Sequence, residues 1–254
     1  MFPFFDSLTH PSLLGEWFKG EDSSFKTLNK EYKTNKYFIG ACAVNNPVYG
    51  MDNSKFFLEC SKYKWLYPVA RVSNVKLGIN EIKIANKIGF KAIKIHPRQL
   101  KIKNLSKLNK IFALMQKKKL ILFLCTYYYT NPSYWPSSDY IHQISKICNS
   151  FPKLKIVLLH GGGVRLIEFI EFVRFNKNIL LDLSLTFMKY NGSSIEKDIN
   201  FAISNFDKRI CIGSDHPEYK PSEIIRKISR FKKSVDKEKI KNVSFKNIKT
   251  FLEI

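Results

Sequence analysis

The chain has 254 residues, of which 44% are hydrophobic and 14% aromatic. Disordered chains contain fewer apolar and aromatic residues, so this composition excludes extended disorder and predicts a folded protein with a sizeable core. The formal net charge is +22, from 43 Lys and Arg against 21 Asp and Glu. The length suits one large domain, which we expect to span residues 1–254.

The basic residues are spread along the chain in pairs and triplets, such as Lys117 to Lys119 and Lys232 to Lys233. No zinc-finger spacing or RNA-recognition signature accompanies them. We therefore interpret the charge as a bias of composition and expect no specific nucleic-acid partner. A nucleic-acid-associated protein is the alternative that the charge alone supports.

The five cysteines do not form a disulfide pattern, because their number is odd and no CxxC pair occurs among Cys42, Cys60, Cys125, Cys148 and Cys211. The longest apolar run covers residues 120–124 and is far shorter than the ~20 residues of a membrane span. The first residues lack the pattern of a signal peptide. We therefore expect a cytoplasmic protein with no membrane partner.

Eight short runs of aliphatic, β-branched or aromatic residues predict eight strands, at 2–8, 37–44, 66–72, 92–96, 120–126, 155–160, 179–184 and 209–214. Amphipathic stretches between them predict helices, for example at 78–90, 105–119 and 164–175. Regular alternation of strand and helix is typical of an α/β fold with a parallel sheet.

Eight such units predict a closed (β/α)8 TIM barrel in a single domain. The alternative is an open, doubly wound sheet. The barrel is favoured because no glycine-rich phosphate loop follows the first strand. The sequence HGGG at 160–163 follows the sixth strand and lacks the spacing of a dinucleotide-binding fingerprint.

Polar residues occur where the predicted strands end, which is the end of a barrel where active sites lie. They are His10, Lys94, His96, Cys125, Tyr127, His160, Asp182, Ser184, Asp215 and His216. Four of the five histidines belong to this set. His142 is the exception, which we expect within a helix and on the surface. Convergence of four histidines on one mouth predicts a shared site.

Five segments of the chain resemble one family in the order of their occurrence. They are FDSLTHP at 5–11, GFKAIKIHP at 89–97, IVLLHGGG at 156–163, RICIGSDHP at 209–217 and NVSFKNIKTFLEI at 242–254. These are similar to the first-, fourth-, sixth- and eighth-strand segments and the closing helix of the amidohydrolase-2 (amidohydrolase-related) family. The resemblance covers nearly the whole chain and implies a barrel hydrolase.

The resemblance also implies a divalent metal, such as zinc or manganese, because the family commonly binds one. His10 matches the second histidine of the first-strand motif, His160 the sixth-strand histidine and Asp215 the eighth-strand aspartate. Leu8 stands where the first histidine is expected, and Cys125 stands near the fifth-strand histidine. A metal would therefore need a set such as His10, His160, Asp215 and Cys125. A buried small residue is the alternative interpretation of Cys125.

Other members of the family resemble sugar-lactone and dicarboxylate-lactone hydrolases that work without metal. By this resemblance Asp215 would be the general base, while His160 and His10 would orient the substrate and stabilise the oxyanion. Binding of the substrate would involve Lys94, His96, Arg71 and Tyr127, with Arg98 adding positive charge at the mouth.

The sequence leaves two features of this site undecided, the partner of Lys94 and the position of an aromatic segment. Lys94 and His96 share one strand face and can both point into the barrel, but Lys94 could instead pair with Asp6 or Asp182. The aromatic segment from Tyr127 to Trp135 either lines the pocket or packs on the barrel rim.

The sequence thus predicts a hydrolase of a small, anionic carbonyl compound, such as a lactone, ester or amide. The alternative is a degenerate, non-catalytic barrel that binds or scaffolds, which Leu8 and Cys125 favour. Family members often pair through helical faces, so the resemblance also allows a homodimer. The sequence alone identifies neither the substrate nor the oligomeric state.

The salt dependence of binding to heparin or DNA distinguishes the two interpretations of the positive charge, a bias of composition and a nucleic-acid partner. We expect the protein to elute completely from heparin or DNA resin near physiological salt, because no phosphate-binding signature accompanies its charge. Retention well above that concentration, measured in a salt gradient, would contradict the prediction of no specific nucleic-acid partner.

Overall fold

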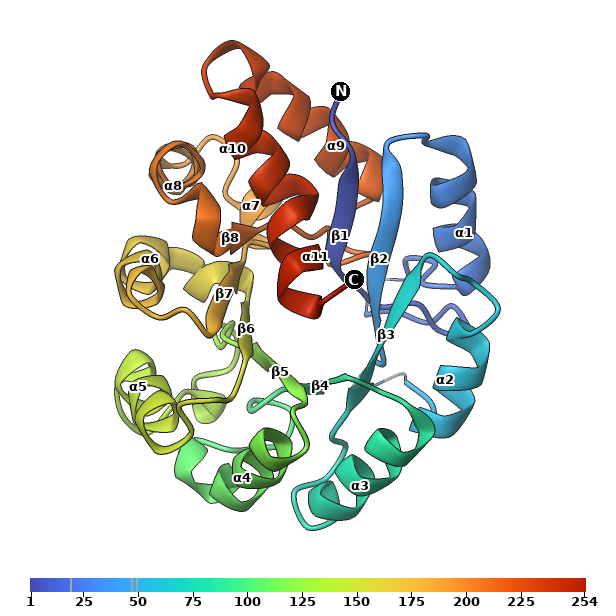
Figure 1. Ribbon diagram of the computed structural model, residues 1–254, viewed down its shortest axis with the longest axis vertical. Coiled ribbons are helices and arrows are strands. Elements are labelled where there is room, and N and C mark those ends of the chain that lie inside the picture. The colour runs from blue at the N-terminus through green and yellow to red at the C-terminus, as the bar shows by residue number, and fades with distance from the viewer. Residues whose placement is uncertain (19, 47, 49) are drawn as a thin grey trace.

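The computed structural model describes residues 1–18, 20–46, 48 and 50–254. A ring of eight parallel strands, hydrogen-bonded in sequence order, forms its centre (Figure 1). The strands are β1 (Phe4–Thr9), β2 (Phe38–Val44), β3 (Leu66–Arg71), β4 (Ala92–Ile95), β5 (Ile121–Cys125), β6 (Ile156–Leu159), β7 (Ile179–Asp182) and β8 (Ile210–Cys211). The predicted (β/α)8 barrel in a single domain is therefore confirmed.

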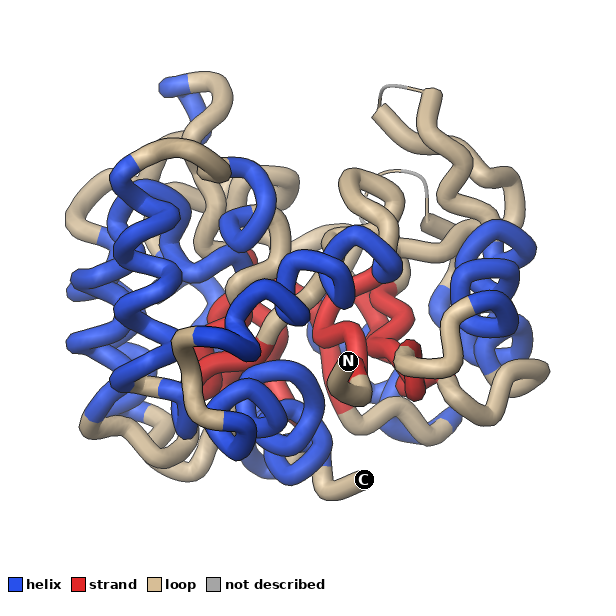
Figure 2. The backbone as a smooth tube through the Cα atoms, turned by 90° about the horizontal axis from the view of Figure 1, so that it is seen from above, coloured by secondary structure: helices blue, strands red, loops and turns tan. Residues whose placement is uncertain are grey.

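Helices lie around the outside of the ring, apart from α11, which lies across one of its ends (Figures 1 and 2). They are α1 (Phe25–Thr34), α2 (Asn53–Cys60), α3 (Gly78–Ile88), α4 (Asn109–Lys117), α5 (Tyr140–Ser150), α6 (Leu166–Arg174), α7 (Thr186–Lys189), α8 (Ser194–Asn205), α9 (Pro221–Arg230), α10 (Lys237–Lys241) and α11 (Asn247–Leu252). The helix predicted at 105–119 begins as a 3-10 turn over Leu105–Leu108 and continues as α4.

The inner faces of the strands form their own apolar core. It consists of Phe5, Leu8, Cys42, Val44, Val69, Ala92, Ile121, Phe123, Val157, Leu159, Leu180 and Cys211. Ile248 and Leu252 of α11 join this core, and Figure 1 shows α11 lying across one end of the ring. Burial of one such aliphatic side chain stabilises a fold by about 1.5–3 kcal/mol. The helix α11 thus seals the end of the barrel opposite the C-terminal ends of the strands.

The barrel closes between β8 and β1 through backbone hydrogen bonds. Asp215 N–H donates to the carbonyl oxygen of Leu8 at 2.9 Å, and His10 N–H donates to that of His216 at 2.8 Å. Because these bonds join the segment after β8 to Leu8 in β1 and to His10 directly after it, closure itself brings His10 and Asp215 side by side.

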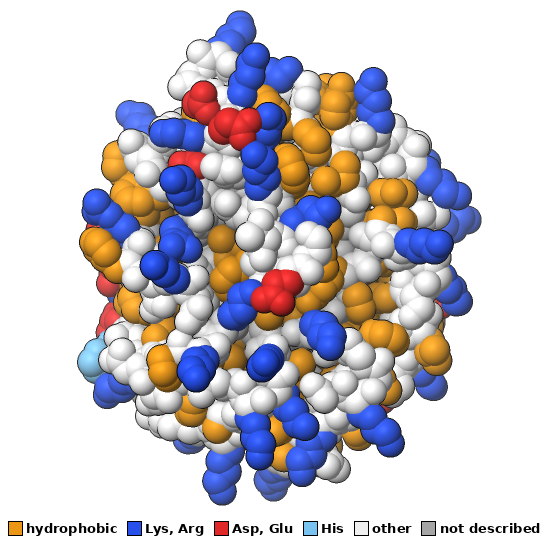
Figure 3. Space-filling model, viewed as in Figure 1, with side chains coloured by type: hydrophobic (Ala, Val, Ile, Leu, Met, Phe, Trp, Pro, Cys, Tyr) orange, Lys and Arg blue, Asp and Glu red, His pale blue; other side chains and the backbone are white. Residues whose placement is uncertain are grey.

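Lysine and arginine side chains are scattered over the face seen in Figure 3 and do not gather in one patch on it. Among the described residues, no helix combines the length and the apolar character that crossing a lipid bilayer requires.

The turn after β6 needs its glycines. Gly161, Gly162 and Gly163 all have positive φ angles of 56°, 71° and 61°. A Cβ atom on Gly162 would lie 2.1 Å from the ring of Phe169 in α6. The backbone N–H of Gly162 donates to Thr126 Oγ1 at 2.9 Å. Only glycine therefore allows α6 to pack this close to the start of the turn that carries His160.

We predict that Gly162→Ala lowers the free energy of unfolding by about 2–5 kcal/mol, because it adds backbone strain to a steric clash with Phe169. Denaturant unfolding followed by circular dichroism measures this loss.

Gly192→Ala is the matched control. Gly192 has a φ of 80°, but nothing lies within 4 Å of its added Cβ. The control should lower the free energy of unfolding by only about 1–2 kcal/mol, the cost of placing a residue with a Cβ atom at a positive φ. Equal losses in the two variants would contradict the packing explanation for Gly162.

Candidate active site

A cavity of about 660 Å³ opens at the C-terminal ends of the strands. Six predicted site residues and the tentative ligand Cys125 line it together: His10, Lys94, His96, Cys125, Tyr127, His160 and Asp215. These side chains come from β4 and β5 or from the segments directly after β1, β4, β5, β6 and β8. Three of the four histidines that were predicted to converge, His10, His96 and His160, therefore line one cavity, whereas His216 is not among the described residues that line it.

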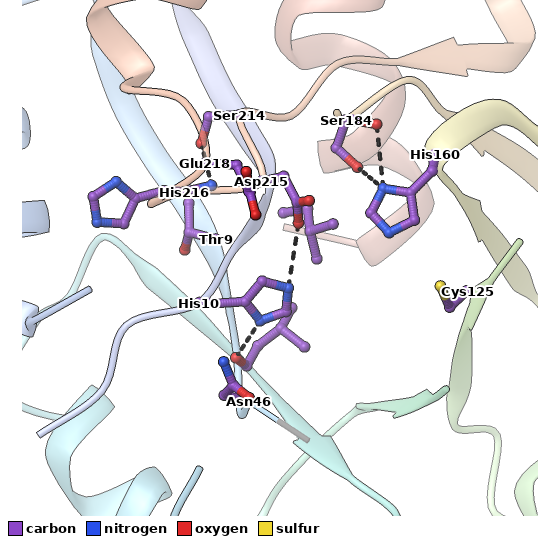
Figure 4. A network of polar contacts seen from close by, with 12 residues as sticks. Thr9, His10, Asn46, Cys125, His160, Ser184, Ser214, Asp215, His216 and Glu218 are labelled. Atoms are coloured by element: carbon purple, nitrogen blue, oxygen red, sulfur yellow. Dashed lines mark hydrogen bonds and ion pairs between the residues drawn. The ribbon is translucent and has the colours of Figure 1, made fainter. Parts of the chain in front are cut away.

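Asp215 lies at the centre of this group, between His10 and His160 (Figure 4). Its Oδ1 is 3.4 Å from Nε2 of His10, and both side chains are almost fully buried. Burial by itself raises the pKa of the Asp215 carboxyl, but its neighbours hold the pKa below the usual range. The charge of His160 has the largest lowering effect, followed by His10 and the charge of Lys94. Asp215 is thus a carboxylate at neutral pH.

His10 is held as a neutral ring. Its Nδ1 lies 3.0 Å from the carbonyl oxygen of Val44, which can only accept a hydrogen bond. Nε2 is therefore the acceptor, and the ammonium of Lys94 donates to it at 3.0 Å. Burial, and then the positive charge of Lys94, lower the pKa of His10 to about 4.

Lys94 thus contacts a histidine, and in the described part of the chain it forms no ion pair with Asp6 or Asp182. Those two acids have other donors. Ser214 N–H donates to Asp6 Oδ1 at 2.8 Å, and the hydroxyls of Ser7 and Ser184 donate to Asp182.

His160 is held in the opposite charge state. Its Nδ1 lies 3.2 Å from the carbonyl oxygen of Ser184, so this nitrogen donates. Burial alone would lower its pKa, but the negative charges of Asp215 and Cys125 outweigh burial and raise the pKa to about 9. His160 is therefore an imidazolium at neutral pH, next to a carboxylate.

Four cavity residues other than glycine have left-handed backbone angles. The φ angles of Lys101, His160, Leu185 and Asp215 are 55°, 69°, 62° and 57°. Such conformations are uncommon for side chains with a Cβ and cost of order 1–3 kcal/mol each. Their gathering around one cavity indicates that the surrounding structure enforces the orientation of these side chains.

Cys125 and His96 form a second contact at the far side of the cavity. Cys125 Sγ lies 3.5 Å from His96 Nε2. Burial raises the pKa of a thiol, but His96 and His160 outweigh it and hold the pKa of Cys125 well below its usual range. Burial lowers the pKa of His96. Cys125 is buried and faces the cavity, not the outer core.

Arg71 is placed differently from the other predicted binding residues. Its guanidinium donates to the backbone carbonyl oxygens of Asn46 and, at 3.0 Å, Gly50. It is not among the described residues that line the cavity. Arg71 therefore holds the segment after β2, which contributes Asn46 and Val48 to the wall.

The aromatic segment after β5 contributes residues both to the wall of the cavity and to the rim of the barrel. Tyr127 and Tyr134 line the cavity. Tyr128, Tyr129 and Trp135 pack against one another on the rim, with ring centroids 4.5–6.2 Å apart.

The sequence did not single out Trp17, although it too lines the cavity. Its ring stacks on that of His10 with centroids 5.4 Å apart, and its Nε1 donates to Glu218 Oε1 at 3.1 Å. Trp17 thus ties the loop after β1 to the loop after β8. In the sequence, only its position in a loop between a strand and a helix could have indicated that Trp17 lies at the site. Arg98, Lys101 and Lys189 add positive charge to the wall.

Two predicted histidine positions lie outside this arrangement. The ring of His216 is buried and points away from Asp215 (Figure 4). His142 is exposed, as predicted, and lies in the first turn of α5.

The residues do not form a metal site as they are arranged. No group of three or more His, Cys, Asp or Glu side chains within the described ranges is placed to hold an ion. The nitrogen of His10 that would face a metal accepts from the Lys94 ammonium instead. Leu8, at the position of the missing histidine, is fully buried in the inner core. The tentative metal set stays a prediction from resemblance.

Solved structures share this barrel. An uncharacterised TIM-barrel protein from Bordetella bronchiseptica is 15% identical over 99% of this chain and 98% of its own, with a TM-score of 0.79. A probable 2-pyrone-4,6-dicarboxylic acid hydrolase from Acinetobacter baumannii is 16% identical over 99% of both chains, with a TM-score of 0.70. A dihydroorotase from Campylobacter jejuni is 15% identical over 99% of this chain and 83% of its own, with a TM-score of 0.64. At these identities the likeness shows the fold.

Among curated proteins, no sequence matches this chain significantly. The family model for amidohydrolase, in contrast, matches residues 48–235, which is most of the chain. The match covers the fourth- and sixth-strand segments and the Asp215 segment on which the resemblance depended. The chain therefore belongs to the amidohydrolase family.

Proposed function

We propose that this protein hydrolyses a small, anionic carbonyl compound, such as a lactone, ester or amide, with Asp215 as the general base. The observation that carries the proposal is the buried Asp215 carboxylate in the cavity, 3.4 Å from His10 and beside the His160 imidazolium. Membership of the amidohydrolase family supports hydrolase-type chemistry for the same site.

In the proposed reaction, Asp215 removes a proton from a water molecule, and the water oxygen attacks the substrate carbonyl carbon. Negative charge then develops on the carbonyl oxygen. When this oxyanion collapses, the C–O or C–N bond to the leaving group breaks, and the proton that Asp215 took from water passes to that group. The His160 imidazolium and the Lys94 ammonium are the buried cations that can stabilise this oxyanion. No step of this reaction passes through a metal ion.

The charge of the cavity favours an anionic substrate. Lys94, Arg98, Lys101 and Lys189 line it, against the acids Asp215 and Glu218. Cations arranged around a cavity bind carboxylates through charge-assisted hydrogen bonds. The Acinetobacter relative was solved with citric acid bound, which is itself a carboxylic acid. We accordingly propose a small-molecule carboxylate as the substrate and no specific nucleic-acid partner.

The same charges explain how Asp215 could work as a base. A carboxylate surrounded by cations is a weak base, because the cations stabilise its charged form. An anionic substrate brings negative charge next to Lys94 and His160 and offsets part of their effect. Substrate binding therefore raises the basicity of Asp215 at the moment when a base is needed.

We predict that His160 is protonated and His10 neutral at pH 7, with titrations near pH 9 and pH 4 respectively. Because the pKa of His160 is raised, its contribution to stability is complete below pH 6.5 and is lost as the pH rises through about 9. Nitrogen-15 NMR of the imidazole rings measures both values.

Asp215→Asn should move the His160 titration to lower pH, since it removes the largest stabilising charge. Titration of both histidines near pH 6.5 in the wild-type protein would contradict the proposed charge distribution.

We predict that Asp215→Asn and His160→Asn each lower kcat by about 10²–10⁴-fold, the usual contribution of a general base or acid. A suitable assay substrate is 2-pyrone-4,6-dicarboxylic acid, followed by its ultraviolet absorbance, together with a panel of sugar lactones.

His142→Asn is the matched control, because His142 is exposed on α5 and should leave kcat unchanged. Circular dichroism should show all three variants folded. Full activity of the Asp215 and His160 variants would disprove the site. Binding of these carboxylates by the wild-type protein without any turnover would favour the non-catalytic barrel instead.

A further inference from the structure

Cys125 differs from the other four cysteines in its position. It ends β5, where the inward alternation of Ile121 and Phe123 continues, and its side chain faces the cavity that holds Asp215. Cys42 and Cys211 lie deep in the inner core, Cys60 lies in the outer core and Cys148 is half-buried on α5. Of the five, Cys125 is the cysteine that lines this cavity.

Two histidines flank the thiol of Cys125. His96 Nε2 lies 3.5 Å from Sγ, and the positive charge of His160 lowers the pKa of the same thiol. Nδ1 of His96 is buried and has no hydrogen-bond partner among the described residues. Nothing described at Nδ1 therefore fixes the protonation state of this ring, which leaves Nε2 able to accept the thiol proton.

A thiol and a histidine within hydrogen-bond reach, beside a cavity, form the pair that nucleophilic cysteine catalysis requires. The thiols of Cys42 and Cys211 have the opposite environment, because burial and the nearby carboxylates of Asp6 and Asp182 raise their pKa. The environment of Cys125 includes His160 and His96, and the charge of Lys94 also interacts with it. These groups stabilise a sulfur that carries negative charge.

We propose that Cys125 is a nucleophile of this site that forms a transient thioester with the substrate. The proposal rests on the hydrolase function proposed above and adds a covalent step to it. The sulfur attacks the carbonyl carbon, a C–S bond forms, and the C–O bond to the leaving alcohol breaks. His96 takes the thiol proton and returns it to the oxygen of the leaving group.

The second half of the reaction uses Asp215. Asp215 takes a proton from water, the water oxygen attacks the thioester carbon, and the C–S bond breaks. The proton from water then returns to the sulfur, and the acid product leaves. Figure 4 shows Asp215 and Cys125 on different sides of the His160 ring. The acyl group held on Cys125 thus lies within the cavity whose opposite wall carries the base.

The first test uses the complete protein and needs no substrate. Iodoacetamide is added at neutral pH, and peptide mass spectrometry follows the alkylation of each cysteine. We expect Cys125 to react at least about tenfold faster than Cys148, although Cys148 is the more exposed of the two. His96→Gln should slow alkylation of Cys125 by a similar factor and leave Cys148 unchanged. Equal or faster reaction of Cys148 in the wild-type protein would overturn the proposal.

The second test traps the acyl group. Asp215→Asn protein is mixed with p-nitrophenyl acetate, quenched in acid and mapped by mass spectrometry. We expect one acetyl group on the Cys125 peptide, and none on the corresponding peptide of the Asp215→Asn, Cys125→Ala double variant. Acetylation of lysines alone would contradict a nucleophilic Cys125.

Turnover separates this proposal from the hydrolase function itself. On a lactone that the wild-type protein hydrolyses, Cys125→Ala and Cys125→Ser should lower kcat at least about 100-fold, while Cys148→Ala should not change it. Unchanged turnover in both Cys125 variants, with turnover lost in Asp215→Asn, would overturn the covalent step and leave the Asp215 hydrolase standing. If Cys125→Ala does not fold, the labelling of the wild-type protein still decides the matter.

Discussion

Buried charge is the constraint on which this structure depends. The Asp215 carboxylate and the Lys94 ammonium both lie inside the mouth of the barrel and are nearly inaccessible to solvent. An isolated charge in such a place would be strongly unfavourable, so each must be compensated. His10 lies between them, 3.0 Å from Lys94 and 3.4 Å from Asp215, and the His160 imidazolium compensates Asp215 from the other side. Loss of one member would leave another charge uncompensated.

The backbone enforces this arrangement. His160 and Asp215 both have positive φ angles, and Asp215 is also fixed by the hydrogen bond that closes the barrel between β8 and β1. The fold therefore determines the site through its closure, and the free energy that strain costs at these residues is offset by the rest of the barrel. A fixed cluster of alternating charge suits hydrolysis, because it need not reorganise as the oxyanion develops.

Much of the fold could be predicted from the sequence, because the eight apolar runs and the amphipathic stretches between them carry the periodicity of strands and helices. The strand ends were less certain. The run at 209–214 was predicted as strand throughout, yet β8 ends at Cys211, because the segment after it turns to pair with Leu8 and to present Asp215. The convergence of His10, His160 and Asp215 followed from their places at strand ends.

Contacts between loops could not be predicted. Arg71 was expected to face the substrate, but the backbone carbonyl oxygens of a neighbouring loop hold its guanidinium. Trp17 lies in an irregular loop, where no periodicity indicates what a side chain contacts. The partner of Lys94 was also open, since Asp6 lies within β1, Asp182 ends β7 and His10 directly follows β1. Only the structure shows that Lys94 contacts His10.

The central claim is that Lys94, His10, His160 and Asp215 form the proposed site without a metal ion. Elemental analysis of protein purified without a chelator or a metal-affinity tag tests it most directly. The structure predicts far less than one zinc or manganese per chain, because the Lys94 ammonium already contacts Nε2 of His10. One tightly held divalent ion per chain would contradict this claim, since Lys94 would have to leave His10 before a metal could bind there.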